Sequence, residues 1–154
     1  MWEKLVGTCS VPVKNKIDKE EIKKFALAIG EPLPIYIDEQ FAKQSKHGRI
    51  LAPPTFPRTL DFGEIKGMKL PSAGLIHGEQ MYQYTRPLYE GEIIHGQCQL
   101  LACEKKQSRN GTMLLIKLKQ TGFDEDENEI FTSIRTLIMT EKLLKEVCFD
   151  DSAK

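Results

Sequence analysis

The hydrophobic pattern divides the chain into a helical first part and an extended second part. Near the start, apolar residues recur at the three- and four-residue spacing of an amphipathic helix. Asp18 has the character of an N-cap, and Glu21 follows it as in a capping box. Gly30 and Pro32 end the pattern. The sequence therefore predicts a helix whose apolar stripe consists of Ile22, Phe25, Ala26 and Ile29.

Shorter elements are expected around this helix. Residues 7–13 suit a short first strand. A second helix is expected over about residues 38–48, with Phe41 and Ala42 turned inward. Residues 55–62 suit a further, central helix, because a proline within the first turn of a helix is tolerated.

The second half of the chain predicts four long strands separated by turn signals. Asn110-Gly111 is a strong hairpin signal, since both residues tolerate a positive φ. Both faces of the last strand are partly apolar, so we expect a helix to cover one face and a partner chain the other. The four strands are expected over residues 75–85, 92–105, 112–123 and 129–141.

The order of these elements is an α+β plan in a chain of 154 residues, which suits one domain over residues 1–154. An antiparallel sheet wrapped around one central helix is the hot-dog fold. Such a sheet leaves strand edges, through which these domains pair. We therefore expect a single hot-dog domain that forms a homo- or hetero-oligomer with another hot-dog chain.

Charge and cysteine usage exclude several classes of protein. Lys plus Arg and Asp plus Glu number 22 each, so no net basic field attracts nucleic acid. The chain has no signal peptide or membrane-spanning stretch, which predicts a cytoplasmic protein without a membrane partner. The acidic run 124–128 lacks the glycine and glutamate of a calcium loop and suits an exposed turn.

The cysteines are expected to be buried or half-buried free thiols in a reducing cytosol. None of them forms a CxxC pair or has a histidine at metal-ligand spacing, so no metal site is expected. Cys98 and Cys103 are an odd number of residues apart in one predicted strand, which places them on opposite faces. The four cysteines are Cys9, Cys98, Cys103 and Cys148.

Five short stretches carry a resemblance to a known family. In their order and spacing, they resemble the MaoC-like dehydratase family, and within it the N-terminal or A-subunit branch. The match covers nearly the whole chain. The stretches are IGEPLPIYIDE (29–39), APPTF (52–56), HGEQ (77–80), YTRPL (84–88) and GE (91–92).

The resemblance implies reversible hydration and dehydration of an acyl thioester, carried on CoA or on acyl-carrier protein, without a cofactor. Active members contain a G-D-x-N-P-x-H segment, whose Asp and His flank one water molecule and act as base and acid. The amides at a helix N-terminus receive the thioester oxygen. Here Thr55 and Phe56, after Pro54, would supply those amides, unless they form an ordinary proline-marked helix start. His77 either binds near the thioester or is a surface or satisfied core histidine. Arg86 either binds a phosphate of the carrier or forms a structural ion pair.

The acid–base positions depart from the family pattern. Glu31 stands in place of the Asp, and its extra methylene shifts the carboxylate by an amount that can cost on the order of a hundredfold in rate. Leu33 replaces the Asn, and Tyr36 replaces the His. A tyrosine has a reference pKa of about 10, against about 6.5 for histidine, so Tyr36 suits hydrogen-bond donation better than proton exchange at neutral pH.

Several hypotheses follow. The first is the substrate-holding component of an (R)-3-hydroxyacyl-thioester dehydratase, or enoyl-thioester hydratase, which acts in fatty acid metabolism as a lyase together with a partner subunit. The second is a stand-alone homodimeric hydratase that uses Glu31 and Tyr36 as catalytic residues. The third is a non-catalytic acyl-CoA-binding subunit. A hot-dog thioesterase is less favoured, because Asp61 lies at the far end of the predicted central helix.

Overall fold

The computed structural model describes residues 1–109 and 111–151, without the side chains of residues 148–151. The strands are β1 (Val13–Lys16), β2 (Ile76–Tyr84), β3 (Ile93–Ser108), β4 (Gly111–Phe123) and β5 (Glu129–Thr140). The α-helices are α1 (Lys19–Ala28), α2 (Pro34–Ile37), α3 (Glu39–Gln44) and α4 (Glu141–Asp151). Two short 3-10 helices are η1 (Glu3–Leu5) and η2 (Phe56–Thr59).

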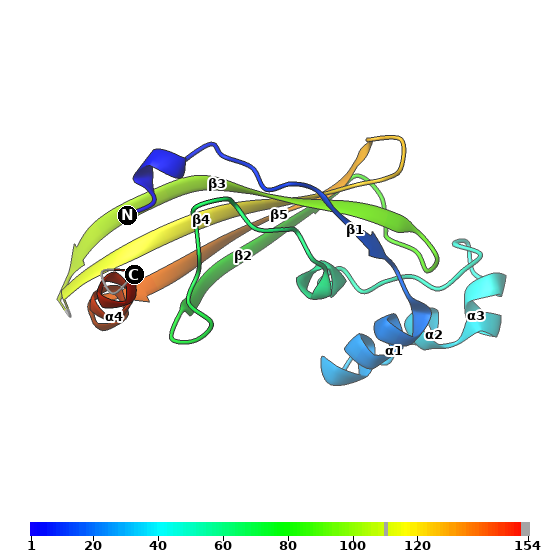
Figure 1. The fold of residues 1–154 in the computed structure, drawn as a ribbon. Coiled ribbons are helices and arrows are strands. Elements are labelled where there is room, and N and C mark those ends of the chain that lie inside the picture. Colours follow the sequence, from blue (N-terminus) through cyan, green and yellow to red (C-terminus); the bar gives the residue numbers. More distant parts are fainter. Residues whose placement is uncertain (110, 152–154) are drawn as a thin grey trace.

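The strands form one antiparallel five-stranded sheet in the order β1-β3-β4-β5-β2 (Figure 1). β3, β4 and β5 follow one another as a meander, and β2 returns beside β5. The four long strands and the α+β hot-dog class expected from the sequence are therefore confirmed. Ser108 pairs with Gly111, which closes the predicted β3–β4 hairpin, and Gly111 has a φ of 101°. Asn110 itself lies outside the described residues.

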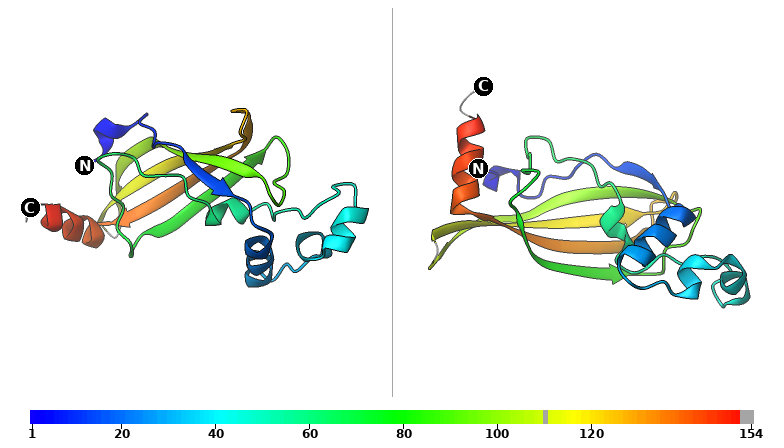
Figure 2. Two further views of the ribbon diagram at one scale, coloured as in Figure 1. Left: turned by 45° about the vertical axis from the view of Figure 1, so that its right-hand side comes forward. Right: turned by 90° about the horizontal axis from the view of Figure 1, so that it is seen from below.

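The helices gather at the two ends of the sheet. Figure 2 shows α1, α2 and α3 at one end, called the helical end below, and α4 at the opposite end. In α1, Asp18 accepts hydrogen bonds from the backbone N–H groups of Glu20 and Glu21, which confirms the predicted N-cap. Ile22 is buried, and so is Ala26, but Ile29 is 43% exposed because the helix ends before it. The predicted apolar stripe is therefore correct except at its last position.

The central helix is where the sequence-based expectation is wrong. Instead of a helix over residues 55–62, the chain makes the single turn η2 and becomes extended at Leu60, with a ψ of 155°. Tertiary hydrogen bonds hold the extended part. The Asn15 side chain accepts from the Asp61 N–H and donates to the Asp61 carbonyl, both at 2.8 Å. The Ser10 hydroxyl donates to the Phe62 carbonyl at 2.6 Å. These bonds compete with the helical ones and end the helix after four residues.

Two further expectations are corrected near the N-terminus. The first strand lies at Val13–Lys16 rather than at residues 7–13, which instead make the isolated bridge Cys9–Gln99 to β3. α3 starts after Asp38 and buries Ala42 as expected, but Phe41 is 50% exposed. Successive residues of a helix point about 100° apart, so with Ala42 turned toward the core, Phe41 lies at the edge of the buried face.

A β-bulge changes the placement of the cysteines. The β3–β4 register shifts between Leu100 and Ala102, which inserts one extra residue into β3. Cys98 and Cys103 are therefore both buried on the same face, not on opposite faces. Both are free thiols, as is Cys9, which is exposed rather than buried. The side chain of Cys148 lies outside the described residues.

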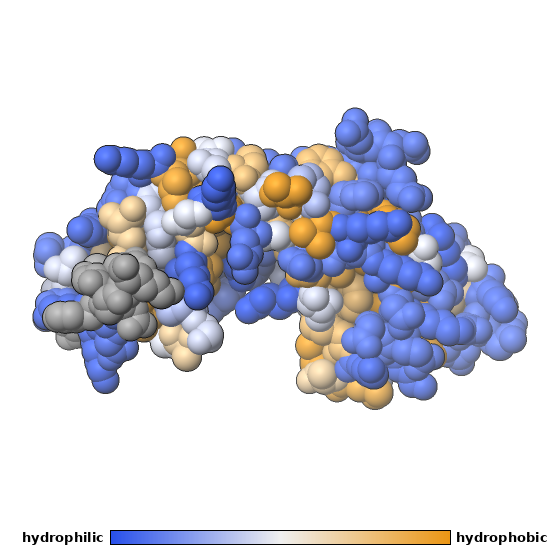
Figure 3. Space-filling model, viewed as in Figure 1, coloured by the Kyte–Doolittle hydropathy of each residue, from blue (hydrophilic) through white to orange (hydrophobic). Residues whose placement is uncertain are grey.

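One face of the sheet, called the inner face below, is turned toward η2 and residues 60–75. It packs Phe131 edge-on against Phe62, with ring centroids 6.1 Å apart. With the central helix reduced to one turn, this face is only partly covered. Figure 3 shows a hollow beneath the sheet, between the α4 end and the helical end, with hydrophobic surface on the helical side. The inner face presents Gln80, Tyr82, Cys98, Leu100, Leu118, Gln120, Phe131, Ser133, Arg135 and Leu137.

Candidate functional site

The segment with the degenerate acid–base positions connects α1 to α2. Gly30 has a φ of 74°, which lets the chain leave α1 at a sharp angle. The N–H of Glu31 returns to the Ala26 carbonyl at 2.9 Å, and the Glu31 side chain is exposed. Pro34 occupies the first turn of α2, so its missing N–H costs no helical hydrogen bond. This geometry places Tyr36 one turn later on α2.

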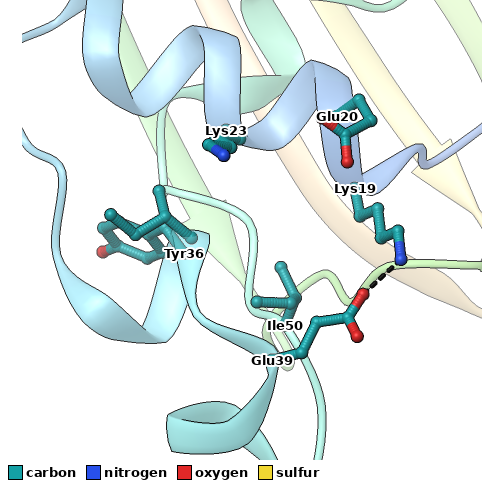
Figure 4. Close-up of a pocket in the computed structure, with 7 residues that line it drawn as sticks. Lys19, Glu20, Lys23, Tyr36, Glu39 and Ile50 are labelled. Carbon is teal, nitrogen blue, oxygen red and sulfur yellow. Dashed lines mark hydrogen bonds and ion pairs between the residues drawn. The ribbon is translucent and has the colours of Figure 1, made fainter.

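Tyr36 lines a pocket of about 180 Å³ between α1, α2 and α3 (Figure 4). Lys19 and Glu39 form an ion pair across this pocket. Burial raises the pKa of the Tyr36 phenol, and the negative charge of Glu31 raises it further. The phenol is therefore protonated at neutral pH and acts as a hydrogen-bond donor. The pocket is lined by Lys19, Glu20, Lys23, Tyr36, Ile37, Glu39 and Ile50.

The stretch APPTF lies at the helical end of the sheet. The Tyr84 hydroxyl donates to the Pro54 carbonyl at 2.6 Å, which ties the stretch to the end of β2. Phe56 is 2% exposed and packs edge-on against Phe25, with centroids 5.7 Å apart. Its N–H donates to the Pro53 carbonyl at 2.9 Å, so this amide is already engaged. Thr55 is exposed immediately before η2.

Arg86 forms a structural ion pair, as one of the two sequence-based interpretations holds. Its guanidinium lies 2.8 Å from a carboxylate oxygen of Glu92 and donates to the Pro87 carbonyl at 2.9 Å. Glu92 also accepts from the Tyr89 N–H at 3.0 Å and pairs with Arg49 at 3.4 Å. The carboxylate thus organises the turn that leads from β2 to β3.

His77 lies apart from the other candidates. It is at the start of β2, whereas Tyr84, which touches Pro54, is at the end of the same strand. Seven residues of strand span roughly 23 Å, so His77 and the APPTF stretch are far apart. Nε2 of His77 lies 2.8 Å from Oε1 of Gln80, whose amide donates to the Ser133 hydroxyl. The structure thus brings Glu31 close to Tyr36 but does not bring His77 to them.

The sequence reasoning missed two cations that face the hollow. Arg135 lies at the middle of β5 on the inner face, and Arg58 reaches the same pocket from η2. Burial lowers the pKa of Arg135. A signal was available, since Arg135 stands on the otherwise apolar or small-residue face of the last predicted strand.

Among the described residues, no group of three or more His, Cys, Asp or Glu side chains is arranged to hold a metal ion. Within the same part of the chain, no helix has both the length and the apolar character needed to cross a membrane.

Comparisons with known proteins agree with the fold. A UPF0336 protein of Thermobifida fusca is 30% identical over 113 residues, covering 70% of this chain and 73% of the relative. The HadBC (3R-hydroxyacyl-ACP dehydratase) complex of Mycobacterium tuberculosis contains a chain with a TM-score of 0.68 and 16% identity, covering 88% of this chain and 97% of that one. The (R)-hydratase from A. caviae involved in PHA biosynthesis has a TM-score of 0.63 and 18% identity, covering 86% and 94%.

At these identities the solved structures show the fold alone. The family is shown by a sequence model that describes the FAS1-like dehydratase domain region and matches residues 4–133. That match includes α1, the segment around Tyr36, η2 and most of the sheet. The chain therefore belongs to the FAS1-like dehydratase family and has the MaoC-like hot-dog fold expected from its sequence motifs.

Proposed function

We propose that this chain is the substrate-holding subunit of an (R)-3-hydroxyacyl-thioester dehydratase, or enoyl-thioester hydratase, and that a second hot-dog chain completes the catalytic site. One observation carries the proposal. The position that needs a reversible acid–base group holds Tyr36, and both burial and Glu31 keep its phenol protonated. Addition of water across the 2,3 double bond requires a group that takes up a proton and one that releases it near neutral pH. A partner must supply them.

The shape of the subunit supports a role in holding substrate. The shortened η2 leaves a hollow under the inner face that a full central helix would fill. An acyl chain is the ligand that suits such a space, because apolar walls gain from its burial. Tyr36 and exposed Thr55 lie at the helical end, where we place the thioester. The carrier is CoA or acyl-carrier protein.

The edge strand β2 supports the assembly with a second chain. Its outer neighbour position is empty in the sheet order, so its backbone groups are available for pairing. Ile76 and Met81 on this strand are 50% and 49% exposed. The similar HadBC structure is described as a complex. The reducing cytoplasm suits the free thiols Cys98 and Cys103, and we place the reaction there, in fatty acid metabolism.

The test is hydration of crotonyl-CoA and longer enoyl-CoAs by the chain alone and with a hot-dog chain that carries an intact D-x-N-P-x-H segment. We expect no turnover from the chain alone and turnover from the mixture. Tyr36→Phe should leave the activity of the mixture within a few-fold. Turnover by the chain alone that is abolished in Glu31→Gln would instead establish the stand-alone enzyme. Binding without turnover in any mixture would establish a non-catalytic acyl-CoA-binding subunit.

A further inference from the structure

Arg135 is a half-buried cation on β5, and its enclosed Nε has no hydrogen-bond partner among the described residues. None of the ion pairs among the described residues includes Arg135. In the sheet, Arg135 lies between Leu118 on β4 and Gln80 on β2. Enclosing part of a guanidinium without an anion beside it costs free energy, which a ligand or partner that carries a negative charge can offset.

A second cation faces the same space. Arg58 extends from η2 and lines, together with Arg135, a pocket of about 280 Å³. Burial is the main cause of the lowered pKa of Arg135, and the positive charge of Arg58 acts in the same direction, against Cys98 and Tyr82, which raise the pKa. Two guanidinium groups that face one cavity repel each other until an anion lies between them. The remaining wall consists mainly of Leu70, Pro71, Ala73, Leu75, His77 and Leu137.

An apolar extension adjoins this pocket on the other side of Arg135. A second pocket, of about 240 Å³, is bounded by Ile65, Met68 and Leu118. Glu64 and Lys69 also lie on its wall, and both are exposed. Glu64 forms no ion pair with Arg135, so it does not neutralise that charge. The combined space therefore offers two guanidinium groups beside apolar side chains, with the exposed Lys69 and Glu64 at its rim.

The chemistry of this space defines its ligand. A guanidinium presents parallel N–H donors that match a carboxylate, and hydrocarbon walls suit the methylene chain attached to it. We propose that Arg58 and Arg135 bind the carboxylate at the far end of an acyl thioester, so that the substrates are ω-carboxyacyl thioesters. The inference rests on the proposed function for the thioester end. The cation pair itself is independent of it.

The position of Arg135 fits a tail that enters from the helical end. Along β5, Arg135 is four residues from Phe131, a distance of roughly 13 Å at the rise of a strand. Phe131 contacts Tyr84, with ring centroids 5.5 Å apart, and Tyr84 is bonded to Pro54. A thioester held near Thr55 thus needs a tail of medium length to reach the guanidinium groups.

The decisive experiment compares the binding of suberoyl-CoA and octanoyl-CoA by titration calorimetry on the whole chain. The two esters have the same chain length and differ in the terminal carboxylate. We expect suberoyl-CoA to bind at least about tenfold more tightly, as a charge-assisted hydrogen bond permits. Arg135→Met and Arg58→Met should remove this preference. Arg58 is exposed, so its variant tests the site without any change in the sheet.

The matched control is Lys66→Met. Lys66 is an exposed cation in the segment between η2 and β2, and it lines neither pocket. It should keep the preference. A second probe, octanoate against octan-1-ol by thermal shift, reads the cation pair without CoA. A stabilisation by octanoate alone, lost in Arg135→Met, is expected.

Equal binding of the two CoA esters by the native chain would overturn the inference. The proposed function would be unaffected, because the hydration assay with a partner judges it separately. Binding of octanoate without any preference between the esters would also overturn the assignment of substrate class. If the preference vanishes when the second hot-dog chain is added, a carboxylate of that chain occupies the site, and the inference is again overturned.

Discussion

Substitution of Gly96 by alanine tests the least expected part of the fold, the extended course of residues 60–63 against the sheet. A Cβ atom at this position of β3 would lie 2.4 Å from the Asp61 carbonyl oxygen and 3.0 Å from the Phe62 ring. Backbone cannot rotate away as a side chain can, so the chain must lift off the sheet. That movement strains the paired hydrogen bonds, each 2.8 Å long, between Asn15 and Asp61.

The magnitude follows from these contacts. Overpacking of this kind costs about 1–3 kcal/mol, and a weakened hydrogen bond adds about 1 kcal/mol. Replacing a strand glycine returns about 0.5–1 kcal/mol through the unfolded chain. We therefore expect Gly96→Ala to lower the free energy of unfolding by about 2 kcal/mol. For a domain of this size, the midpoint of thermal unfolding should fall by about 4–8 °C.

Urea titration and thermal unfolding followed by circular dichroism measure the effect. Gly78→Ala is the matched control in β2, since its nearest contacts are the flexible end of Ile138 at 3.2 Å and the Thr136 carbonyl oxygen at 3.3 Å, almost 1 Å farther than the backbone contact at Gly96. We expect its stability to remain within about 0.5 kcal/mol of the native chain. Equal stability of the two variants would refute the close approach of Asp61 to β3, and with it the replacement of the central helix by an extended segment.

Three further predictions address single interactions. Tyr84→Phe should lower the free energy of unfolding by about 1 kcal/mol, measured by urea titration, because the Pro54 carbonyl loses its donor; unchanged stability would contradict the bond. Asp18→Ala removes the N-cap of α1 and should cost about 1 kcal/mol, whereas Asp18→Asn should restore most of it. Arg135→Met should stabilise the ligand-free chain by up to about 1 kcal/mol, because it removes a half-buried cation whose Nε has no hydrogen-bond partner in the described part of the chain; a loss of stability in thermal unfolding would contradict this expectation.

The local features of this protein were determined by its sequence. Alternating apolar residues and turn signals located β2 to β5, since each strand carries its own period of two and its own turn chemistry. The cap of α1 was equally local, because Asp18 bonds to N–H groups only two and three residues away. The altered acid–base pair could also be identified from the sequence, because Glu31 and Tyr36 occupy positions that the family motif defines by spacing alone.

Tertiary structure decided the features that depend on distant partners. Residues 55–62 have a pattern compatible with a helix. However, Asn15 and Ser10, each more than forty residues earlier in the chain, form hydrogen bonds with the backbone of Asp61 and Phe62 that a helix would use. The bulge in β3 reversed the face of Cys103, because its phase is set by pairing with β4. Arg58 on η2 and Arg135 on β5 are brought together because both line one pocket of the folded chain. Such contacts join residues with no common local period, so only the folded chain brings them together.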